Sequence, residues 1–367
     1  MTTAAPDVDR PGPAWPASVE AWRERARGCL PSFVFDHVDE GVEDGDAVRA
    51  NRASVRQPWL VQRVLSGIER PEVPRWRVLD QLVPTPILLA PTGHHAFVHP
   101  EAERATVDGA GEVGAIAVIS MASSLAFDEI ASSARAPLWL QLFPTRDRAA
   151  LRDLVQQAVG VGYCGVVITV DTPQVGRFER SRSDPVADHL PVVEGTLARC
   201  FPRVAGVPDL LDPTAGWDLV EALRTWCEVP LLVKGVQCAA DARAAHEAGA
   251  DAVYVSNHGG RSLGNAPGTL AMLREVVDEL AGATTIVVDG GFERGSEVLA
   301  ALAVGAHAVA IGRPYLWGLA TAGSRGVARV VGQMSDELHD AMVVAGVADP
   351  SSITSSIVRW PGGPPAP

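Results

Sequence analysis

The sequence contains few cysteines and no long uninterrupted apolar run. Its five cysteines are scattered, odd in number and free of any CxxC pair, so neither a disulfide framework nor a zinc site is indicated and no metal is expected. No apolar run reaches about 18 residues, and the first residues lack a basic segment followed by an apolar one. We therefore expect no membrane span, no secretory signal and a cytoplasmic protein.

Basic charge is scarce as well. The 367 residues include 31 Lys and Arg against 44 Asp and Glu, which gives a formal net charge of -13 and an isoelectric point near 5.1. Nucleic acids and anionic membrane surfaces attract basic proteins, so neither is an expected partner. The hydrophobic content of 47% is enough for a large core. A globular protein that acts on a small molecule is the expectation.

From residue 86 onward the sequence repeats a pattern of apolar strand, loop and helix. Amphipathic segments such as 148–160, 240–247 and 295–304 separate the short apolar runs, as right-handed crossovers between parallel strands require. Eight such units predict a (β/α)₈ barrel, with a doubly wound open sheet as the alternative. The predicted strands are residues 87–90, 116–119, 138–142, 166–170, 231–233, 252–255, 286–288 and 309–311.

The barrel is expected to be one domain over residues 18–360, between disordered tails at 1–17 and 361–367. Ser18 can cap a helix that runs through Cys29, and Pro31 can open a second helix over 32–42, so a helical extension precedes the barrel. The connection after the fourth strand, residues 171–219, has few periodic apolar positions. It predicts an active-site lid or a disordered insertion.

Polar residues and glycines follow the predicted strands, at the end where a barrel carries its active site. Taken singly they are ordinary, because Ser and Thr are common at strand ends and Asp-Gly-Gly is a common turn. Together they indicate a site for a flat polar heterocycle with a phosphate tail. The backbone N–H groups of Gly290, Gly291 and Gly312 can bind the phosphate.

Residues 256–261, Ser-Asn-His-Gly-Gly-Arg, follow the sixth predicted strand. His258 offers a base, the two glycines let a flat ligand approach, and Arg261 offers a planar fork that suits a carboxylate. A single histidine at a strand end is usually structural, whereas the whole string is far more specific.

This string resembles the active-site signature of the FMN-dependent α-hydroxy-acid oxidases and dehydrogenases, and the resemblance extends from about residue 30 to residue 345. It implies FMN as cofactor, His258 as catalytic base, Asp171 as the carboxylate that stabilises its imidazolium, and Arg261 as ligand of the substrate carboxylate. Lys234 would favour a reduced, anionic flavin. The resemblance further implies a homotetramer and FMN contacts at Pro91, Thr92, Gly93, Ser120, Gln141, Thr169, Lys234, Ser256, Asp289, Gly291, Gly312 and Arg313.

The predicted substrate site departs from the family pattern. His37 and Phe143 stand where the family has tyrosines that contact the substrate, and Phe178 stands where it has a second arginine. Because a charge-assisted hydrogen bond contributes about 1.5–3 kcal/mol, ordinary small hydroxy acids should bind poorly.

Other nearby residues could compensate for these losses. Ala122 stands where some members carry a bulky aromatic and would open volume, and His94 and His95 could supply polar contacts. A protonated His37 could bind an anion. Packing or surface roles for these histidines are equally compatible with the sequence.

The predicted phosphate site also departs from the family pattern. Glu293 stands where the family usually places an arginine on the FMN phosphate, and a carboxylate there is repulsive. Either Arg294 and Arg313 supply the charge, or flavin binding is weak.

The function predicted from the sequence is oxidation of a 2-hydroxy acid, or a close analogue, at Cα, with electrons passed to FMN and carbanion and hydride routes both open. One alternative is a divergent flavoenzyme that oxidises an amine, an amino-acid derivative or a carrier-bound substrate. The other is a catalytically silent barrel that acts as an interaction subunit. The retained His258, Asp171, Arg261 and Lys234 count against the silent barrel.

Overall fold

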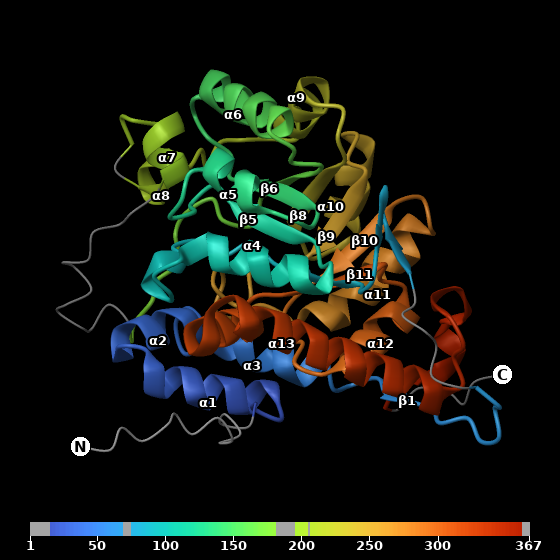
Figure 1. The fold of residues 1–367 in the computed structure, drawn as a ribbon. Coiled ribbons are helices and arrows are strands. Elements are labelled where there is room, and N and C mark those ends of the chain that lie inside the picture. The colour runs from blue at the N-terminus through green and yellow to red at the C-terminus, as the bar shows by residue number, and fades with distance from the viewer. Residues whose placement is uncertain (1–14, 69–74, 181–194, 205, 362–367) are drawn as a thin grey trace, which may run out of the picture.

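The computed structural model describes residues 15–68, 75–180, 195–204 and 206–361, and its centre is a closed barrel of eight parallel strands (Figure 1). The order around the barrel is β10-β11-β4-β5-β6-β7-β8-β9, so each strand pairs with its neighbours in the chain and the last closes on the first. This confirms the predicted (β/α)₈ barrel and excludes the open sheet. The strands are β4 (Ile87–Leu89), β5 (Ala117–Ser120), β6 (Leu138–Leu142), β7 (Val166–Thr169), β8 (Leu231–Val236), β9 (Ala252–Val255), β10 (Thr285–Val288) and β11 (Ala308–Ile311).

The barrel strands are apolar along nearly their whole length because both of their faces are covered. Every residue of β4, β5, β6, β7, β9 and β11 is buried, as expected for parallel strands between a packed interior and a layer of helices. Alternating polarity is therefore missing, and the eight runs could be recognised only as short apolar segments.

Helices cover the outside of the barrel. The three amphipathic segments predicted from the sequence form α6, α10 and α12, each within one residue of the expected bounds. The last helix is long and has non-helical backbone at Ala322 and Gly323. Within the described part of the chain, no helix is both long and apolar enough to cross a membrane. The covering helices are α4 (Ala102–Val113), α5 (Phe127–Ser133), α6 (Arg148–Gly160), α9 (Asp218–Trp226), α10 (Ala239–Glu247), α11 (Thr269–Leu280), α12 (Gly295–Val304) and α13 (Arg313–Ala345).

A helical extension precedes the barrel, as predicted. It consists of α1 (Val19–Cys29), α2 (Ser32–Asp39) and α3 (Asp46–Ser54), and Figure 1 shows α1 running beside α13. Ser18 caps α1 by accepting a hydrogen bond from the Ala21 N–H.

The second helix ends at Asp39, three residues earlier than expected. The chain leaves the helix there because it passes against the loop that holds His258. Val42 N–H donates to the Gly260 carbonyl at 3.0 Å. A Cβ on Gly41 would lie 2.8 Å from that same oxygen, so the close approach needs glycine at this position.

Part of the predicted N-terminal tail is packed. The Trp15 ring lies 5.7 Å from the Trp22 ring, with Arg325 and Arg329 over it. The Ala17 carbonyl accepts a hydrogen bond from Gln333. Residues 15–17 are thus held against α13, which corrects the prediction for them. Residues 1–14 and 362–367 lie outside the described residues.

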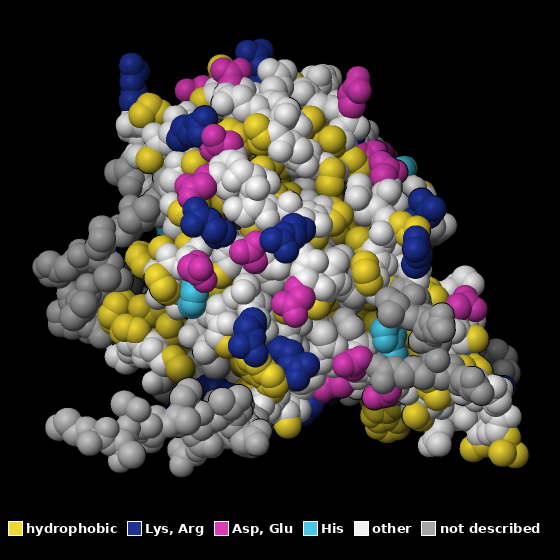
Figure 2. Space-filling view, viewed as in Figure 1, with side chains coloured by type: hydrophobic (Ala, Val, Ile, Leu, Met, Phe, Trp, Pro, Cys, Tyr) yellow, Lys and Arg dark blue, Asp and Glu magenta, His cyan; other side chains and the backbone are white. Residues whose placement is uncertain are grey.

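The remaining elements are short. β2 (Trp76–Val78) and β3 (Gln81–Val83) form a hairpin, and β1 (Trp59–Leu60) pairs with β12 (Val358–Arg359). The long connection after β7 contains α7 (Gly195–Cys200) and α8 (Val207–Leu210), while its residues 181–194 and 205 lie outside the described residues. On the face shown in Figure 2, acidic and basic side chains are interspersed, so this face presents no basic patch for a nucleic acid.

Candidate active site

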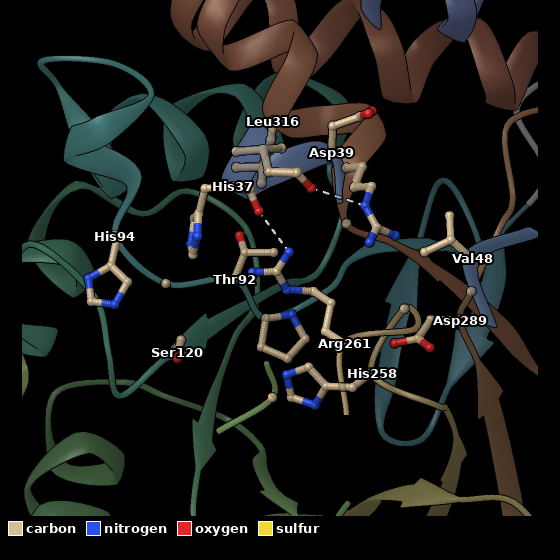
Figure 3. A pocket seen from close by; sticks show the side chains of 18 of the residues that line it. His37, Asp39, Val48, Thr92, His94, Ser120, His258, Arg261, Asp289 and Leu316 are labelled. Carbon is tan, nitrogen blue, oxygen red and sulfur yellow. Dashed lines mark hydrogen bonds between the residues drawn. The ribbon is translucent and has the colours of Figure 1, made fainter. Parts of the chain in front are cut away.

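A cavity of about 990 Å³ lies at the carboxyl ends of the barrel strands. It collects side chains that are far apart in the sequence, and Figure 3 shows His37, Arg261 and His258 directed into it. A volume of this size suits a small-molecule site. The predicted site residues that line it are His37, Pro91, Thr92, Gly93, Ser120, Gln141, Phe143, Thr169, Phe178, Lys234, His258, Arg261, Asp289, Gly291, Gly312 and Arg313.

His258 and Asp171 form a hydrogen-bonded pair. His258 Nδ1 lies 2.9 Å from Asp171 Oδ1, and the Thr172 hydroxyl lies 3.0 Å from the same nitrogen and donates to that oxygen at 3.1 Å. Burial alone would raise the pKa of Asp171, but the charges of His258 and Lys234 hold it below the ordinary range. An ionised Asp171 makes Nδ1 the protonated nitrogen and leaves Nε2 of His258 free to accept a proton.

A glycine makes room for this pair. Gly235 has φ +113°, and a Cβ at this position would lie 2.6 Å from the Cβ of Asp171. It falls at the register shift between Lys234 and Val236 in the pairing of β8 with β9. His258 itself has a left-handed φ of 57°, and its N–H donates to the Ser256 hydroxyl at 3.0 Å. The loop backbone is therefore shaped to direct the imidazole into the cavity.

Arg261 is held by the end of helix α2. Its Nη1 donates to the carbonyls of His37 at 2.7 Å and of Glu40 at 3.1 Å, and the first of these bonds is drawn in Figure 3. Burial, with repulsion from Arg313, lowers the pKa of Arg261 to about 9, which leaves it cationic at neutral pH. The guanidinium lies 4.3 Å from the centre of the Phe178 ring, a favourable cation–π distance.

His37 is not a cation in this structure. Burial, with the charge of Arg261 and the proximity of His94, lowers the pKa of His37 to about 3. Its ring meets that of Phe178 at 5.8 Å in an edge-on arrangement. This low pKa argues against the expectation that His37 is protonated and binds an anion. The neutral imidazole can still exchange a hydrogen bond with a ligand.

The two histidines after the first barrel strand have different positions. His94 lines the cavity and stacks on Phe97 at 5.6 Å. His95 is buried and structural, since its Nε2 lies 2.7 Å from the Thr92 hydroxyl and its Nδ1 lies 2.9 Å from the Thr106 hydroxyl. Of the two, the structure brings only His94 to the cavity.

Hydrogen bonds connect the polar groups across neighbouring strands. Ser120 donates to Gln141 Oε1 at 2.7 Å, and Gln141 Nε2 donates to the Thr169 hydroxyl at 3.0 Å. Lys234 Nζ donates to the Ser256 hydroxyl at 3.0 Å and lies 3.7 Å from Asp289 Oδ2. Ser256 does not line the cavity, so its contribution is to hold Lys234 and the backbone of His258.

These residues fit a flavin. The hydroxyl and amide groups on β5, β6 and β7 match the edge of a polar heterocycle, and Lys234 offers a cation beside it. Asp289 Oδ1 is buried and has no hydrogen-bond partner within the described residues, although Asp289 borders the cavity. An acceptor in that position suits the hydroxyl groups of a ribityl chain.

We call the part of the cavity beside Gly290 and Gly291, where the sequence predicts the FMN phosphate, the phosphate end. Of the two cations predicted there, Arg294 and Arg313, the structure brings only Arg313 to the cavity. Arg294 does not line the cavity, because it precedes α12 and its Nη1 lies 3.1 Å from Glu337 Oε1 of α13. Arg313 does line the cavity, where it donates to the carbonyls of Val38 at 3.0 Å and Glu40 at 2.9 Å. Burial lowers the pKa of Arg313.

The sequence suggested no role for three contributors to the site. Thr172 bridges Asp171 and His258, Gly235 makes room for Asp171, and Arg52 lines the cavity from α3. Thr172 could have been found because it follows Asp171 directly. Arg52 could not, because it lies 239 residues from the glycine turn that it contacts.

Together, the barrel, the His–Asp pair and the polar strand ends define an oxidoreductase that binds a flavin. A model of the FMN-dependent dehydrogenase family matches residues 26–360. The chain therefore belongs to that family, whose cofactor is FMN.

Named relatives agree with this assignment. A peroxisomal (S)-2-hydroxy-acid oxidase of Oryza sativa subsp. japonica is 36% identical over 360 residues, covering 95% of this chain and 97% of that protein. An L-lactate oxidase of Nostoc sp. is 34% identical over 359 residues, covering 94% and 98%. The solved structure of mandelate oxidase with (S)-2-phenylpropionate has a TM-score of 0.83 and 31% identity, covering 94% and 98%.

Proposed function

We propose that the protein oxidises a 2-hydroxy acid at Cα to the corresponding 2-oxo acid. The observation that carries the proposal is that His258, joined to Asp171 at 2.9 Å, lines the same cavity as the cationic Arg261. A base and a carboxylate ligand are what this reaction requires of the protein. The hydroxy-acid, lactate and mandelate oxidases among its relatives support the assignment.

Each residue has a definite part in the proposed reaction. Within the described residues, the hydrogen bonds of Arg261 all come from Nη1, which leaves Nη2 and Nε for the substrate carboxylate. His258 accepts the proton released by the substrate at Nε2, and ionised Asp171 stabilises the resulting imidazolium. FMN, when bound, supplies the acceptor for the two electrons.

The substrate side chain is proposed to be larger and less polar than that of glycolate or lactate. Phe143 and Phe178 place aromatic rings on the cavity, and the small side chain of Ala122 also lines it. Apolar walls favour buried apolar area at about 25 cal/mol per Å², whereas a small polar acid finds few hydrogen-bond partners there.

Anaerobic reduction of the bound flavin by a panel of acids tests this function. Mandelate is expected to bleach the flavin faster than lactate, and lactate faster than glycolate. The matching amino acids form the second arm, because faster bleaching by phenylglycine than by mandelate would favour the amine-oxidising alternative. Fastest bleaching by glycolate would contradict the proposed substrate class.

The setting of the enzyme is also a proposal. All five cysteines are free, in keeping with a reducing compartment such as the cytoplasm, although the rice relative is named as peroxisomal. A homotetramer is proposed from the family resemblance. Light scattering on the purified chain measures this directly, and a monomeric mass would contradict it.

A further inference from the structure

At the phosphate end of the cavity, helix α3 supplies a positive charge that the sequence did not predict. After the turn formed by Gly290 and Gly291, the next side chain that borders the cavity with a charge is the acidic Glu293. Arg294 is directed to Glu337 and away from the cavity. A phosphate in this end needs cations from outside the turn, and helix α3 brings Arg52 to the cavity wall.

Helix α3 packs directly on this turn. Gly291 has φ +89°, and a Cβ on it would lie 2.8 Å from the carbonyl carbon of Asn51 and 3.0 Å from the backbone nitrogen of Arg52. Only glycine permits such an approach. Asn51 secures the contact by exchanging amide hydrogen bonds of 2.8 and 2.9 Å with Asn257. The backbone of Arg52 is thus fixed against the turn.

The Arg52 side chain is held at the rim of the phosphate end. Its Nη2 lies 3.1 Å from Glu293 Oε2, its Nη1 lies 3.0 Å from Glu297 Oε2, and Nη1 also donates to the Gly291 carbonyl. Glu297 has a separate structural role, because its Oε2 accepts the backbone N–H groups of Glu293 at 2.8 Å and Arg294 at 3.1 Å. Glu293 is therefore the partner of Arg52 that a phosphate can displace.

We propose that Arg52 binds the FMN phosphate in this chain and that Glu293 competes with the phosphate for the same guanidinium. A phosphate dianion takes the fork of an arginine in a bidentate manner and carries more charge than a carboxylate. FMN affinity is then set by the balance between these two side chains.

Comparing FMN with riboflavin isolates the phosphate, because the two ligands share the ring system and the ribityl chain. The full-length protein is freed of flavin by dialysis and titrated with each ligand while the quenching of flavin fluorescence is followed. Arg52→Gln is expected to weaken FMN binding roughly 10- to 100-fold, the loss of a charge-assisted hydrogen bond, and to leave riboflavin binding unchanged. Arg49→Gln is the matched control. It lies on the same helix, is 65% exposed in its side chain and pairs with Asp46.

The opposite substitution gives a second and independent measurement. Glu293→Gln keeps the shape of the side chain and removes the competing charge, so FMN should bind about tenfold more tightly, with riboflavin again unchanged. In a protein that also carries Arg52→Gln, this gain in FMN affinity should shrink, because the guanidinium for which Glu293 and the phosphate compete is absent. Equal weakening of FMN and riboflavin by Arg52→Gln would indicate a structural role, and unchanged FMN binding would assign the phosphate to other groups. Either result would overturn the proposal.

Discussion

The two walls of the cavity are built on different principles. The wall at the strand ends is a connected set of polar groups, in which Ser120, Gln141 and Thr169 are hydrogen-bonded to one another and Lys234 is bonded to Ser256. A second part of the lining, the aromatic wall, comes from α2 and the loops after β6 and β7 and contributes the rings of Phe33, His37, Phe143 and Phe178. In the proposed reaction the polar wall holds the reacting groups, and the aromatic wall selects among the acids.

This difference explains how the substrate site can diverge while the catalytic groups remain. Ser120, Gln141, Thr169 and Lys234 each have a buried hydrogen-bond partner. Replacing one of them therefore leaves another group unsatisfied at a cost of about 1–3 kcal/mol. The side chains of Phe143 and Phe178 form no hydrogen bonds, so replacing them leaves no buried partner unsatisfied. Substitutions on the aromatic wall therefore change selectivity at little cost in stability, whereas substitutions on the polar wall disturb a whole network.

The largest effect is expected from the polar wall at His258. His258→Ala should lower the rate of flavin reduction about 10²- to 10⁴-fold, the usual contribution of a general base, while FMN remains bound. Anaerobic stopped-flow reduction in a single turnover measures this rate without interference from the electron acceptor.

Two variants give this experiment its controls. His246→Ala removes a histidine from α10, where its ring bonds Thr284, and should leave the rate unchanged. Asp171→Asn should retain part of the activity, because the imidazole keeps its place but loses a stabilising charge. A His258→Ala variant that reduces its flavin as fast as the parent would move the search for a base to His37 and His94, which also line the cavity among the described residues.

A smaller effect, of a different kind, is expected from the aromatic wall at Phe143. Phe143→Tyr adds one hydroxyl beside the reacting centre without changing the ring, and should raise kcat/KM for lactate roughly 3- to 10-fold, the value of one hydrogen bond. Mandelate turnover by the same variant is the internal control and should change less. Equal gains for both acids would mean that the wall does not discriminate between them, and the contrast between the two walls would fail.

The sequence was sufficient to predict the polar wall. Strand ends converge in any closed barrel, so knowing where eight apolar runs stop was enough to place Thr92, Gln141, Lys234 and His258 on one cavity. The bounds of α6 and α12 were also predictable, because the apolar periodicity of each helix is a local pattern. Local pattern carries this part of the fold.

The sequence was insufficient wherever side-chain direction or packing between distant segments decides the outcome. Arg294 follows the glycine turn as a phosphate ligand would, yet it points to α13 because it precedes the first turn of α12. Arg52 reaches the same turn from another helix. His95 is one residue from His94 but is turned into the core. None of these directions is encoded by spacing along the chain.

The last expected effect, on stability and not on rate, concerns the His258–Asp171 pair. Because the folded pKa of Asp171 lies below its ordinary value of 3.8, its charge stabilises the fold at every pH above that value, and this contribution is lost as pH falls through the folded pKa. Asp171→Asn should therefore lower the free energy of unfolding by about 1–3 kcal/mol near pH 7. Melting temperatures measured between pH 5 and pH 3 should show the parent's advantage shrinking below about pH 4. An advantage that grows from pH 5 to pH 3 would mean that Asp171 is protonated in the folded protein, and His258 would then lack the charge that orients its proton and leaves Nε2 as the base.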